Sequence, residues 1–365
     1  MRQCADRFDP VGDWGIFPAA RPLVVAGPCS VESRDMLLSV AAALKEQGVQ
    51  VLRAGLWKPR THPGCFEGLG ADALEYLTEV RSRFGLKVCT EVAGPSHVAA
   101  CLEAGVDMLW IGARTTVNPF QVQEIADALE GTDVPVLVKN PVSQDPGLWA
   151  GAVERLSRSG VRKIGLVHRG FASIDETRYR NAPIWQSAIE MRMRFPRLPM
   201  LCDPSHMAGK AEYVRELSQK ALDLGFDGLM VEVHPDPARA LSDAAQQIDP
   251  EGFACLLKGL SVRRPDAEEG DYRSSIAGLR SRIDDVDGGI LKLLGDRMEL
   301  SRRIGVTKRS HGVSILQASR WDEVLSRCSR MAEEYGLDED MVRRIFGIIH
   351  EASVREQDKV MSAEL

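Results

Sequence analysis

The chain has 365 residues, a formal charge of −6 at pH 7 and ordinary fractions of apolar and charged residues. Its length suits one large domain plus a smaller one, and its composition excludes disordered and fibrous proteins. The negative charge argues against a nucleic-acid partner, and no stretch reaches the roughly 20 apolar residues that a membrane span requires.

Residues 1–13 show no signal-peptide pattern, because they are polar and mixed in charge. Eight cysteines are scattered without close pairs, which fits reduced thiols better than a disulfide framework. These features predict a cytoplasmic protein.

Short apolar runs alternate with amphipathic segments through the first part of the chain. The runs are Leu23–Gly27, Val51–Gly55, Lys87–Val92, Met108–Ala113, Val134–Asn140, Lys163–Arg169, Met200–Pro204 and Gly228–His234. Eight strand-like runs, each followed by a helix-like stretch, predict an α/β fold in which a (β/α)8 TIM barrel occupies residues 1–260. A doubly wound open sheet is the alternative, but it usually has fewer strands and a glycine-rich first turn that this sequence lacks.

The pattern changes after residues 261–272, a charged stretch with a proline that we interpret as a linker. Beyond it, apolar residues recur at helical spacing from Ile276 to about Val306. Two further helices are expected near Ala318–Tyr335 and Asp338–Met361. Residues 273–365 are therefore predicted to form an all-α helical domain, and the length of its first helix favours a bundle or an intertwined dimer.

Several metal-binding residue types sit where the barrel strands are expected to end. They are Cys29, His206, Glu232 and, eleven residues after Glu232, Asp243. Barrel enzymes build their active sites on this rim, and a thiolate, an imidazole and two carboxylates suit a divalent transition metal. Each residue alone has a structural explanation, such as a core cysteine or a capping aspartate. Four of them on one rim are harder to attribute to packing.

The same rim carries basic residues, namely Arg53, Lys58, Arg60, Arg114, Lys139 and Arg169. Cations that point into a barrel mouth are costly without an anionic partner. One of them could pair with a buried carboxylate such as Glu91. Together they imply one or two anionic substrates, which guanidinium groups can bind in a bidentate manner.

These motifs resemble the first type of 3-deoxy-D-arabino-heptulosonate 7-phosphate (DAHP) synthases, in the branch that also contains the octulosonate phosphate synthases. The resemblance runs from about Leu23 to Gln247. It rests on Gly27-Pro28-Cys29-Ser30, Lys58-Pro59-Arg60-Thr61, Ile111-Gly112-Ala113-Arg114, Asp203-Pro204-Ser205-His206 and Val231-Glu232-Val233-His234-Pro235. The resemblance implies a metal-dependent condensation of phosphoenolpyruvate with erythrose 4-phosphate. The stretch Lys58–Thr61 is the one that favours the four-carbon sugar.

The resemblance also implies a role for each rim residue. Cys29, His206, Glu232 and Asp243 would hold the metal, with Mn²⁺ expected and Co²⁺, Zn²⁺ or Fe²⁺ as alternatives. Arg60 and Thr61 would bind erythrose 4-phosphate, and Arg53, Lys58, Arg114, Lys139 and Arg169 would bind phosphoenolpyruvate. His168 replaces a glutamate that is common in relatives, and either His168 or Lys58 is a candidate proton donor. Asn140-Pro141 and Ala244 also depart from the common pattern.

Three basic residues lie along the first helix of the helical domain. Arg297 and Lys308 are eleven residues apart, so they share one face at about 16 Å along the axis. Arg280 lies seventeen residues before Arg297, roughly 25 Å away and about 100° round the helix. Unless the helix bends sharply, Arg280 can join the same site only from the antiparallel helix of a partner chain, which predicts a homodimer. The alternative is a set of solvated surface cations.

Residues from about Tyr272 to Met361 resemble the all-helical chorismate mutases. The resemblance rests on Leu279-Arg280, Asp296–Leu300, Lys308, Arg320, and Ser353 with Gln357. It implies that Arg280, Arg297, Lys308, Arg320, Ser353 and Gln357 bind chorismate, and that Arg280, Arg297, Lys308 and Gln357 act in its rearrangement to prephenate. Trp321 and Gln317 stand where the family commonly has glutamate and aspartate.

Three hypotheses follow. In the first, both domains are catalytic, and the helical domain can also sense prephenate. In the second, only the barrel is catalytic and the helical domain is regulatory. In the third, the barrel is an octulosonate phosphate synthase, against which Lys58–Thr61 argues. All three predict small-molecule substrates, with no nucleic acid and no membrane, and a homodimer through the helical domain with higher oligomers as an option.

Overall fold

The computed structural model describes residues 8–17, 21–58, 64–173, 177–264 and 270–362. The chain divides into two compact units, Met1–Pro265 and Asp266–Leu365, which are described separately here. Among the described residues, no helix has the length and apolar character needed to cross a membrane.

The first unit is a closed barrel of parallel strands, which confirms the predicted fold class. The strands are β1 (Leu23–Gly27), β2 (Val51–Arg53), β3 (Lys87–Val92), β4 (Met108–Ile111), β5 (Val136–Lys139), β6 (Ile164–His168), β7 (Met200–Cys202) and β8 (Gly228–Glu232). Each strand pairs with its neighbour in sequence, and β1 closes the barrel on β8 with Leu23 opposite Gly228 and Gly27 opposite Glu232. The carboxyl ends of all the strands therefore meet on one rim.

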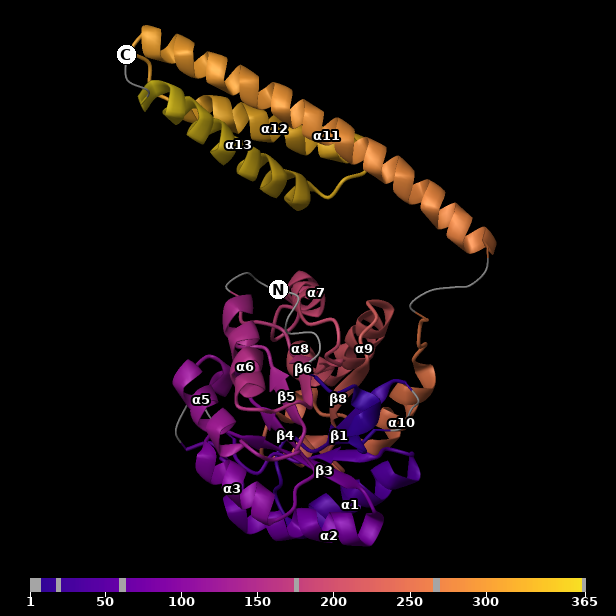
Figure 1. The fold of residues 1–365 in the computed structure, drawn as a ribbon. Helices are drawn as coiled ribbons and strands as arrows, with labels where there is room; N and C mark the ends of the chain where they lie inside the picture. Colours follow the sequence, from indigo (N-terminus) through magenta and orange to yellow (C-terminus); the bar gives the residue numbers. More distant parts are fainter. Residues whose placement is uncertain (1–7, 18–20, 59–63, 174–176, 265–269, 363–365) are drawn as a thin grey trace. The chain divides into compact units, whose positions relative to one another are not determined.

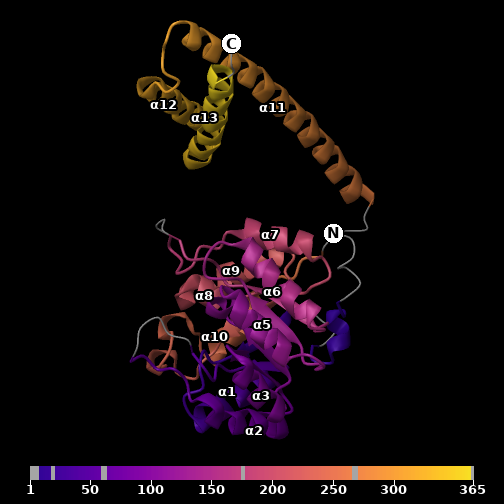
Figure 2. The same cartoon turned by 60° about the vertical axis from the view of Figure 1, so that its left-hand side comes forward.

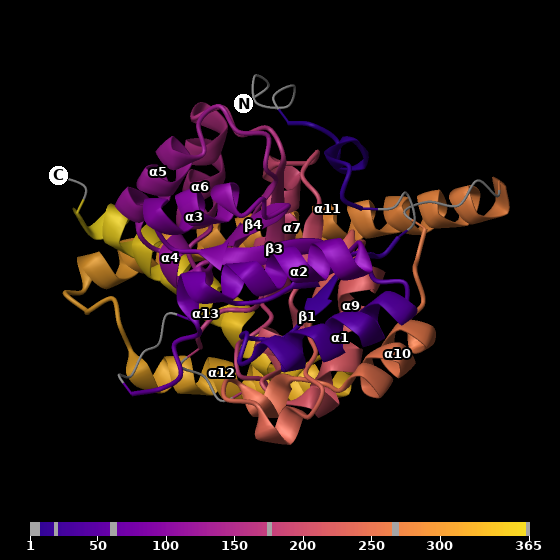
Figure 3. The same ribbon diagram turned by 90° about the horizontal axis from the view of Figure 1, so that it is seen from below.

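Helices cover the outside of the strands, as Figures 1 and 3 show. They are α1 (Arg34–Glu46), α2 (Leu74–Phe84), α3 (Pro95–Glu103), α4 (Ala113–Thr116), α5 (Pro119–Ala128), α6 (Pro146–Arg158), α7 (Trp185–Arg194), α8 (Pro204–Ala208), α9 (Val214–Asp223) and α10 (Pro250–Gly259). Four of them, α5, α6, α8 and α10, begin with an Asn or Asp cap followed by proline. The side-chain oxygen of the cap accepts a backbone hydrogen bond, and proline presets the first helical φ angle.

Alternation along the strands separates an inner core from an outer core. Val25, Val51, Leu137, Val167 and Met230 belong to the inner cluster, which fills the barrel. Their neighbours along the strands join the larger outer cluster under the helices. Trp14 and Ile16, from the segment before β1, also belong to the inner cluster. The described residues before β1 therefore contribute to the barrel core.

The second unit contains α11 (Gly270–Ser310), α12 (Ala318–Glu334) and α13 (Glu339–Ser362). The second half of α11 packs against α13, whereas its first half extends past both shorter helices (Figures 1 and 2). Consequently, Ile283, Val286 and Ile290 on the first half are about half exposed or more. The apolar face of α11 thus continues beyond its intramolecular partner.

Candidate active sites

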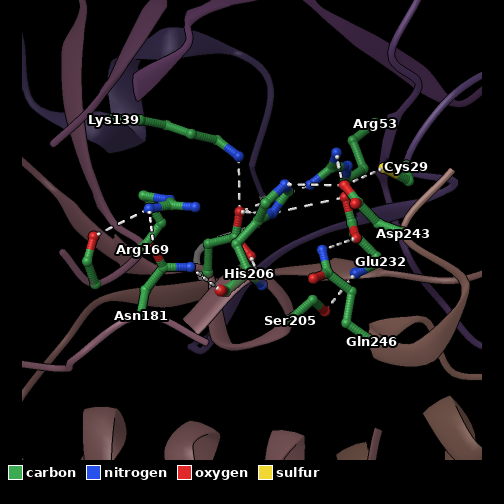
Figure 4. Close-up of polar contacts among 12 residues, drawn as sticks. Cys29, Arg53, Lys139, Arg169, Asn181, Ser205, His206, Glu232, Asp243 and Gln246 are labelled. Carbon is green, nitrogen blue, oxygen red and sulfur yellow. Dashed lines mark hydrogen bonds and ion pairs between the residues drawn. The ribbon is translucent and has the colours of Figure 1, made fainter. Parts of the chain in front are cut away.

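The barrel rim brings four metal-binding side chains together. Cys29 follows β1, His206 lies on α8 just after β7, Glu232 ends β8, and Asp243 lies in the segment after β8. One ligand atom from each lies within 4.8 Å of the others. The Cys29 Sγ is 3.4 Å from Asp243 Oδ2, and the His206 Nε2 is 4.0 Å from the same oxygen. Figure 4 shows the four side chains converging.

The donor set fits a divalent transition metal. Ligand atoms bound about 2.0–2.3 Å from one ion lie roughly 3–4.5 Å from one another, and the four candidate ligand atoms here all lie within 4.8 Å of one another. The His206 ring is held by Asp203, whose Oδ2 lies 2.8 Å from Nδ1. A carboxylate oxygen accepts this hydrogen bond, which leaves Nε2 directed toward the other ligands. Such a carboxylate–histidine pair is typical of metal sites.

The charges around these ligands are strongly coupled. Burial, and then the charge of Glu232, raises the pKa of the Cys29 thiol to about 12, while Lys58 opposes that shift. The ammonium of Lys58 lies 2.8 Å from the Cys29 Sγ. Burial alone would raise the pKa of Glu232, but the charges of His206 and Arg53 lower it below its usual value. The site therefore keeps Glu232 ionised at neutral pH.

Beneath the ligands lies a buried ion network centred on Asp203. Its Oδ2 accepts a 2.7 Å hydrogen bond from Lys139 and lies 3.8 Å from Arg53. Arg53 also donates to Glu232 Oε1 at 3.0 Å and stacks over the Trp110 ring. Arg53 is only 1% exposed, so it lies behind the Cys–His–Glu–Asp cluster and outside the open pocket. Its Nε and Nη1 atoms have no hydrogen-bond partner among the described residues.

A pocket opens beside the Cys–His–Glu–Asp cluster and is rich in cations. Its lining residues are Lys58, Glu91, Ala113, Arg114, Lys139, Arg169, Arg180, His206 and Asp243. Four of the predicted substrate-binding residues, Lys58, Arg114, Lys139 and Arg169, are thus brought to one place. Arg60 and Thr61 lie outside the described residues. Glu91 accepts a hydrogen bond from the Trp110 indole at 2.9 Å, which fixes its carboxylate at the pocket wall.

Arg169 is held rigidly at the back of this pocket. Its Nη1 donates to Asn181 Oδ1 at 2.7 Å, and its backbone N–H donates to Asn140 Oδ1 at 2.7 Å. Burial lowers the pKa of the Arg169 guanidinium to about 10, so it remains charged at neutral pH. The unusual Asn140 therefore serves to position the loop that carries Arg169.

His168 does not reach the pocket, which corrects its assignment as a candidate proton donor. The side chain shares the outer face of β6 with Ile164 and Leu166, because alternate residues of a strand face the same side. Its ring lies among aromatic rings, with centroids 5.6 Å from Phe171 and 5.4 Å from Trp185, and Nε2 bonds to the Pro183 carbonyl. Burial lowers the pKa of His168 to about 4. Its role is in packing.

Four residues that the sequence did not identify as site residues lie beside the predicted ones. Asp203, Asn181, Arg180 and Gln246 all contact predicted site residues. The Asp-Pro pair at Asp203 signals a helix cap, but nothing in the sequence shows that its second oxygen holds a histidine ring. Arg180 and Asn181 come from an irregular segment between β6 and α7, where no periodicity indicates which side chains face the pocket.

The helical unit gathers a second polar group between α11 and α13. Arg297 donates through Nη1 to the Ser353 hydroxyl and lies 3.4 Å from the Ile349 carbonyl oxygen. The Gln357 side chain is 8% exposed, and its Oε1 has no hydrogen-bond partner in the described chain. Lys308 donates to the Ile315 carbonyl oxygen. A partly buried guanidinium and an unsatisfied amide oxygen are features of a polar ligand site.

Other predicted residues of the helical unit lie apart from this group. Arg280 is exposed on the first half of α11, and Arg320 is exposed and pairs with Glu323 at 2.8 Å. Trp321 stacks on His350 with ring centroids 4.1 Å apart. His350, Ser353 and Gln357 follow at spacings of three and four residues on α13, so they share one face. The Trp321–His350 stack therefore lies at one end of the polar group.

Comparisons with known proteins divide the chain in the same way. Residues 18–264 match the DAHP synthetase I family, and residues 279–358 match chorismate mutase type II. The phospho-2-dehydro-3-deoxyheptonate aldolase of Thermotoga maritima is 39% identical over 235 residues, which cover 64% of this chain and 68% of that protein. The 2-dehydro-3-deoxyphosphooctonate aldolase of Rhodopseudomonas palustris strain TIE-1 is 30% identical, over 67% of this chain and 88% of that protein.

Solved structures agree with the sequence comparisons. The crystal structure of the Thermotoga maritima enzyme superposes with a TM-score of 0.58 and 37% identity, covering 64% of this chain and 66% of that one. A truncated form of the same enzyme gives a TM-score of 0.56 and 35% identity, with 64% of this chain and 83% of that one covered. The chain thus spans just under two thirds of the longer crystallised protein. The chain belongs to the DAHP synthetase I family and carries a type II chorismate mutase domain at its C-terminal end.

Proposed function

We propose that the barrel condenses phosphoenolpyruvate with erythrose 4-phosphate and water to give DAHP and inorganic phosphate. The observation that carries this proposal is the adjacency of two groups on one rim. A Cys–His–Glu–Asp cluster borders a pocket lined by Lys58, Arg114, Lys139 and Arg169. A divalent metal in this cluster would interact with the aldehyde of erythrose 4-phosphate. The neighbouring cations would bind the phosphate and carboxylate of phosphoenolpyruvate.

A bound divalent metal, with Mn²⁺ as our first choice, would act as a Lewis acid that polarises the aldehyde. The protein's own groups supply position and charge. Arg169, fixed by Asn181 and Asn140, and Lys139, fixed by Asp203, present preset cations to the anionic substrate. Because these cations are already held in place, they stabilise charge that develops on the leaving phosphate without reorganising. Lys58 remains the candidate proton donor, since its ammonium reaches both the pocket and Cys29.

The choice of sugar rests on the two relatives and on the family motif. The heptulosonate relative is 39% identical and the octulosonate relative 30% identical, which favours erythrose 4-phosphate over a five-carbon sugar. We assign Arg60 and Thr61 to the sugar phosphate through their match to the family motif. The test is phosphate release from phosphoenolpyruvate with erythrose 4-phosphate or arabinose 5-phosphate, before and after chelation and re-addition of Mn²⁺. Turnover that survives chelation, or that prefers arabinose 5-phosphate, would contradict the proposal.

We propose further that the helical unit converts chorismate to prephenate within a homodimer. Arg297, Lys308, Ser353 and Gln357 would bind the substrate, with Arg280 and Arg320 completing the site. The unsatisfied Gln357 Oε1 and the partly buried Arg297 support a ligand at this position. Electrostatic complementarity to the ether oxygen would be sufficient for the rearrangement, which needs no covalent step.

The homodimer proposal rests on the uncovered part of α11. Leu279, Ile283, Val286 and Ile290 continue the face that packs on α13 but lack any cover of their own in the described chain. A partner's α11 lying antiparallel would cover this stripe and could bring the partner's Arg280 toward Arg297. We also place the protein in the cytoplasm, in keeping with the free cysteines of the described residues.

Two assays together separate catalysis from sensing in the helical unit. Chorismate loss is measured for the parent chain and for Arg297→Ala, and DAHP formation is measured with and without added prephenate. Catalysis predicts chorismate turnover that Arg297→Ala abolishes. A purely regulatory unit predicts no turnover, but a prephenate effect on the barrel that Arg297→Ala removes.

A further inference from the structure

Arg180 lies against the metal ligands in a way that neither the motifs nor the pocket chemistry explains. Its Nη1 donates to Asp243 Oδ1 at 3.1 Å and to Gln246 Oε1 at 2.9 Å. Gln246 is 1% exposed, and its Nε2 donates in turn to Glu232 Oε2 at 2.7 Å. One arginine and one glutamine therefore connect the two carboxylate ligands, and Figure 4 shows the inner half of this connection.

The backbone around Arg180 is fixed to the helix that carries His206. The N–H groups of Arg180 and Asn181 donate to the carbonyl oxygens of Ala208 and Met207, each at 3.1 Å. Gly209 ends this helix in the left-handed region with φ at +72°, and a Cβ there would lie 2.3 Å from the Arg180 Cβ. The close approach of the two segments thus depends on a glycine. Arg180 is consequently set in place rather than left on a free loop.

The contacts act on the ligand oxygens in a defined way. Asp243 uses Oδ1 for Arg180, while its Oδ2 faces Cys29 Sγ at 3.4 Å and His206 Nε2 at 4.0 Å. Asp243 also has φ at +46°, a left-handed conformation that aspartate adopts at a cost and that surrounding contacts must maintain. Glu232 uses Oε2 for Gln246, whereas Oε1 faces Arg53 and His206. Arg180 thus holds one oxygen of Asp243, and Gln246 holds the second oxygen of Glu232, whose Oε1 already accepts a hydrogen bond from Arg53 at 3.0 Å. Together these contacts set the orientation of both carboxylates.

We propose that Arg180 and Gln246 are positioning residues that form a relay between Asp243 and Glu232 and preorganise both carboxylates for the metal. This inference rests on the proposed metal site. Outer hydrogen bonds of this kind fix ligand geometry, and their loss typically lowers metal affinity about 10–100-fold. Arg180 reaches the site from the segment between β6 and α7, whose next residue, Asn181, holds Arg169. The same short segment therefore orders both the metal half and the anion half of the pocket.

The test measures metal affinity directly, using the full chain stripped of metal and titrated with Co²⁺. Binding is followed by the thiolate-to-cobalt charge-transfer absorbance, which reports the Cys29 ligand without any turnover. The variants are Arg180→Met, Arg180→Lys, Gln246→Leu and the double variant Arg180→Met with Gln246→Leu. The matched control is Arg178→Met, since Arg178 lies two residues away and pairs with Glu216 and Tyr179 on the surface. Circular dichroism of each apo protein checks that folding is unchanged.

Arg180→Met and Gln246→Leu are each expected to weaken Co²⁺ binding about 10–100-fold, with a smaller loss for Arg180→Lys, which retains the charge. The double variant should lose little more than the larger single loss, because the two residues act as one chain. Co²⁺ binding within about twofold of the parent in both Arg180→Met and Gln246→Leu would overturn the relay, and so would a loss confined to Arg180→Met. A parent chain with no charge-transfer band would instead refute the metal site itself.

Discussion

Asp203 holds His206 at two points, accepting the backbone N–H through Oδ1 at 3.0 Å and contacting the ring Nδ1 through Oδ2 at 2.8 Å. One carboxylate thus caps α8 and orients the imidazole of a proposed metal ligand carried on the first turn of the same helix. Burial alone would raise the pKa of Asp203, but the charges of His206 and Lys139 lower it well below its usual value. It is therefore ionised, and an acceptor only, at neutral pH.

Replacing Asp203 by Asn is expected to preserve the helix cap and weaken the metal site. The amide oxygen of Asn can still accept the His206 backbone N–H, but its NH₂ group cannot accept from the ring Nδ1. The ring then loses the partner that directs Nε2 toward the other ligands. Metal affinity should fall about 10–100-fold, measured by competition with a chromophoric chelator. An Asp203→Asn protein that binds metal as tightly as the parent would show that the ring needs no such partner.

His168 should make the stability of the barrel depend on pH. Burial lowers the pKa of His168 from 6.5 to about 4. As the pH falls from 6.5 towards 4, the unfolded chain takes up a proton at this ring that the folded chain excludes, so stability falls. The contribution to the free energy of unfolding amounts to about 3 kcal/mol across this window. His168→Phe should remove that part of the pH dependence.

The measurement compares urea unfolding of the parent and His168→Phe at several pH values. The variant loses the hydrogen bond to the Pro183 carbonyl at every pH, which lowers its stability by a constant amount. The informative quantity is therefore the change in the free energy of unfolding between pH 6.5 and 4, compared between the two proteins. Groups that the substitution does not affect contribute equally to both proteins and cancel in the comparison. Parallel stability curves would mean that His168 is hydrated in the folded state.

The barrel and its ligand set were predictable because regular structure fixes where their residues lie. Strand ends of a closed parallel barrel share a rim, so Cys29 and Glu232 had to be neighbours once β1 and β8 were recognised. Successive residues of a strand face opposite sides, and this alternation along β6 would have assigned His168 to the outer core and Arg169 to the barrel mouth. Arg180 and Asn181 could not be placed, because they lie in an irregular segment whose course is set by tertiary contacts with α8.

Trp14 is expected to be essential to barrel stability although it lies outside the strands. Its side chain is 5% exposed and belongs to the inner barrel cluster, with its ring 3.3 Å from the position of a Cβ on Gly165. Trp14→Ala should destabilise the barrel by about 3–5 kcal/mol, measured by denaturant unfolding. Phe120→Ala, at a residue 83% exposed, is the control and should change stability by less than about 0.5 kcal/mol. Equal effects of the two substitutions would contradict this role.

A charge on the uncovered stripe of α11 should disrupt the homodimer. Ile290 lies on the stripe and is 49% exposed in the single chain, so Ile290→Lys costs the monomer little but would bury a charge in the dimer. We expect light scattering to give at least twice the 40.2 kDa of one chain for the parent and a lower mass for Ile290→Lys. The control is Leu291→Lys, one residue on and about 100° round the helix. If both variants keep the mass of the parent, the stripe on α11 is not part of the dimer interface.

Trp321 is expected to limit the mutase reaction. It occupies the position at which the resemblance to chorismate mutases places a glutamate that contacts a substrate hydroxyl, and its ring stacks on His350 instead. Trp321→Glu would restore an acceptor for that hydroxyl. A hydrogen bond to a charged group contributes about 1.5–3 kcal/mol, so kcat/KM for chorismate should rise about tenfold or more. Trp321→Phe keeps an aromatic ring for stacking and adds no acceptor, so it should leave kcat/KM unchanged.

The two variants distinguish a weakened enzyme from a binding module. An increase confined to Trp321→Glu would show that Arg297, Lys308 and Gln357 already form a working site that lacks only the hydroxyl contact. An increase in both variants would mean that the bulk of the indole, rather than a missing acceptor, limits the reaction. If neither variant turns over chorismate while prephenate still alters DAHP formation, the helical unit acts by binding alone. Its effect on the barrel must then come from different affinities for two states of the chain.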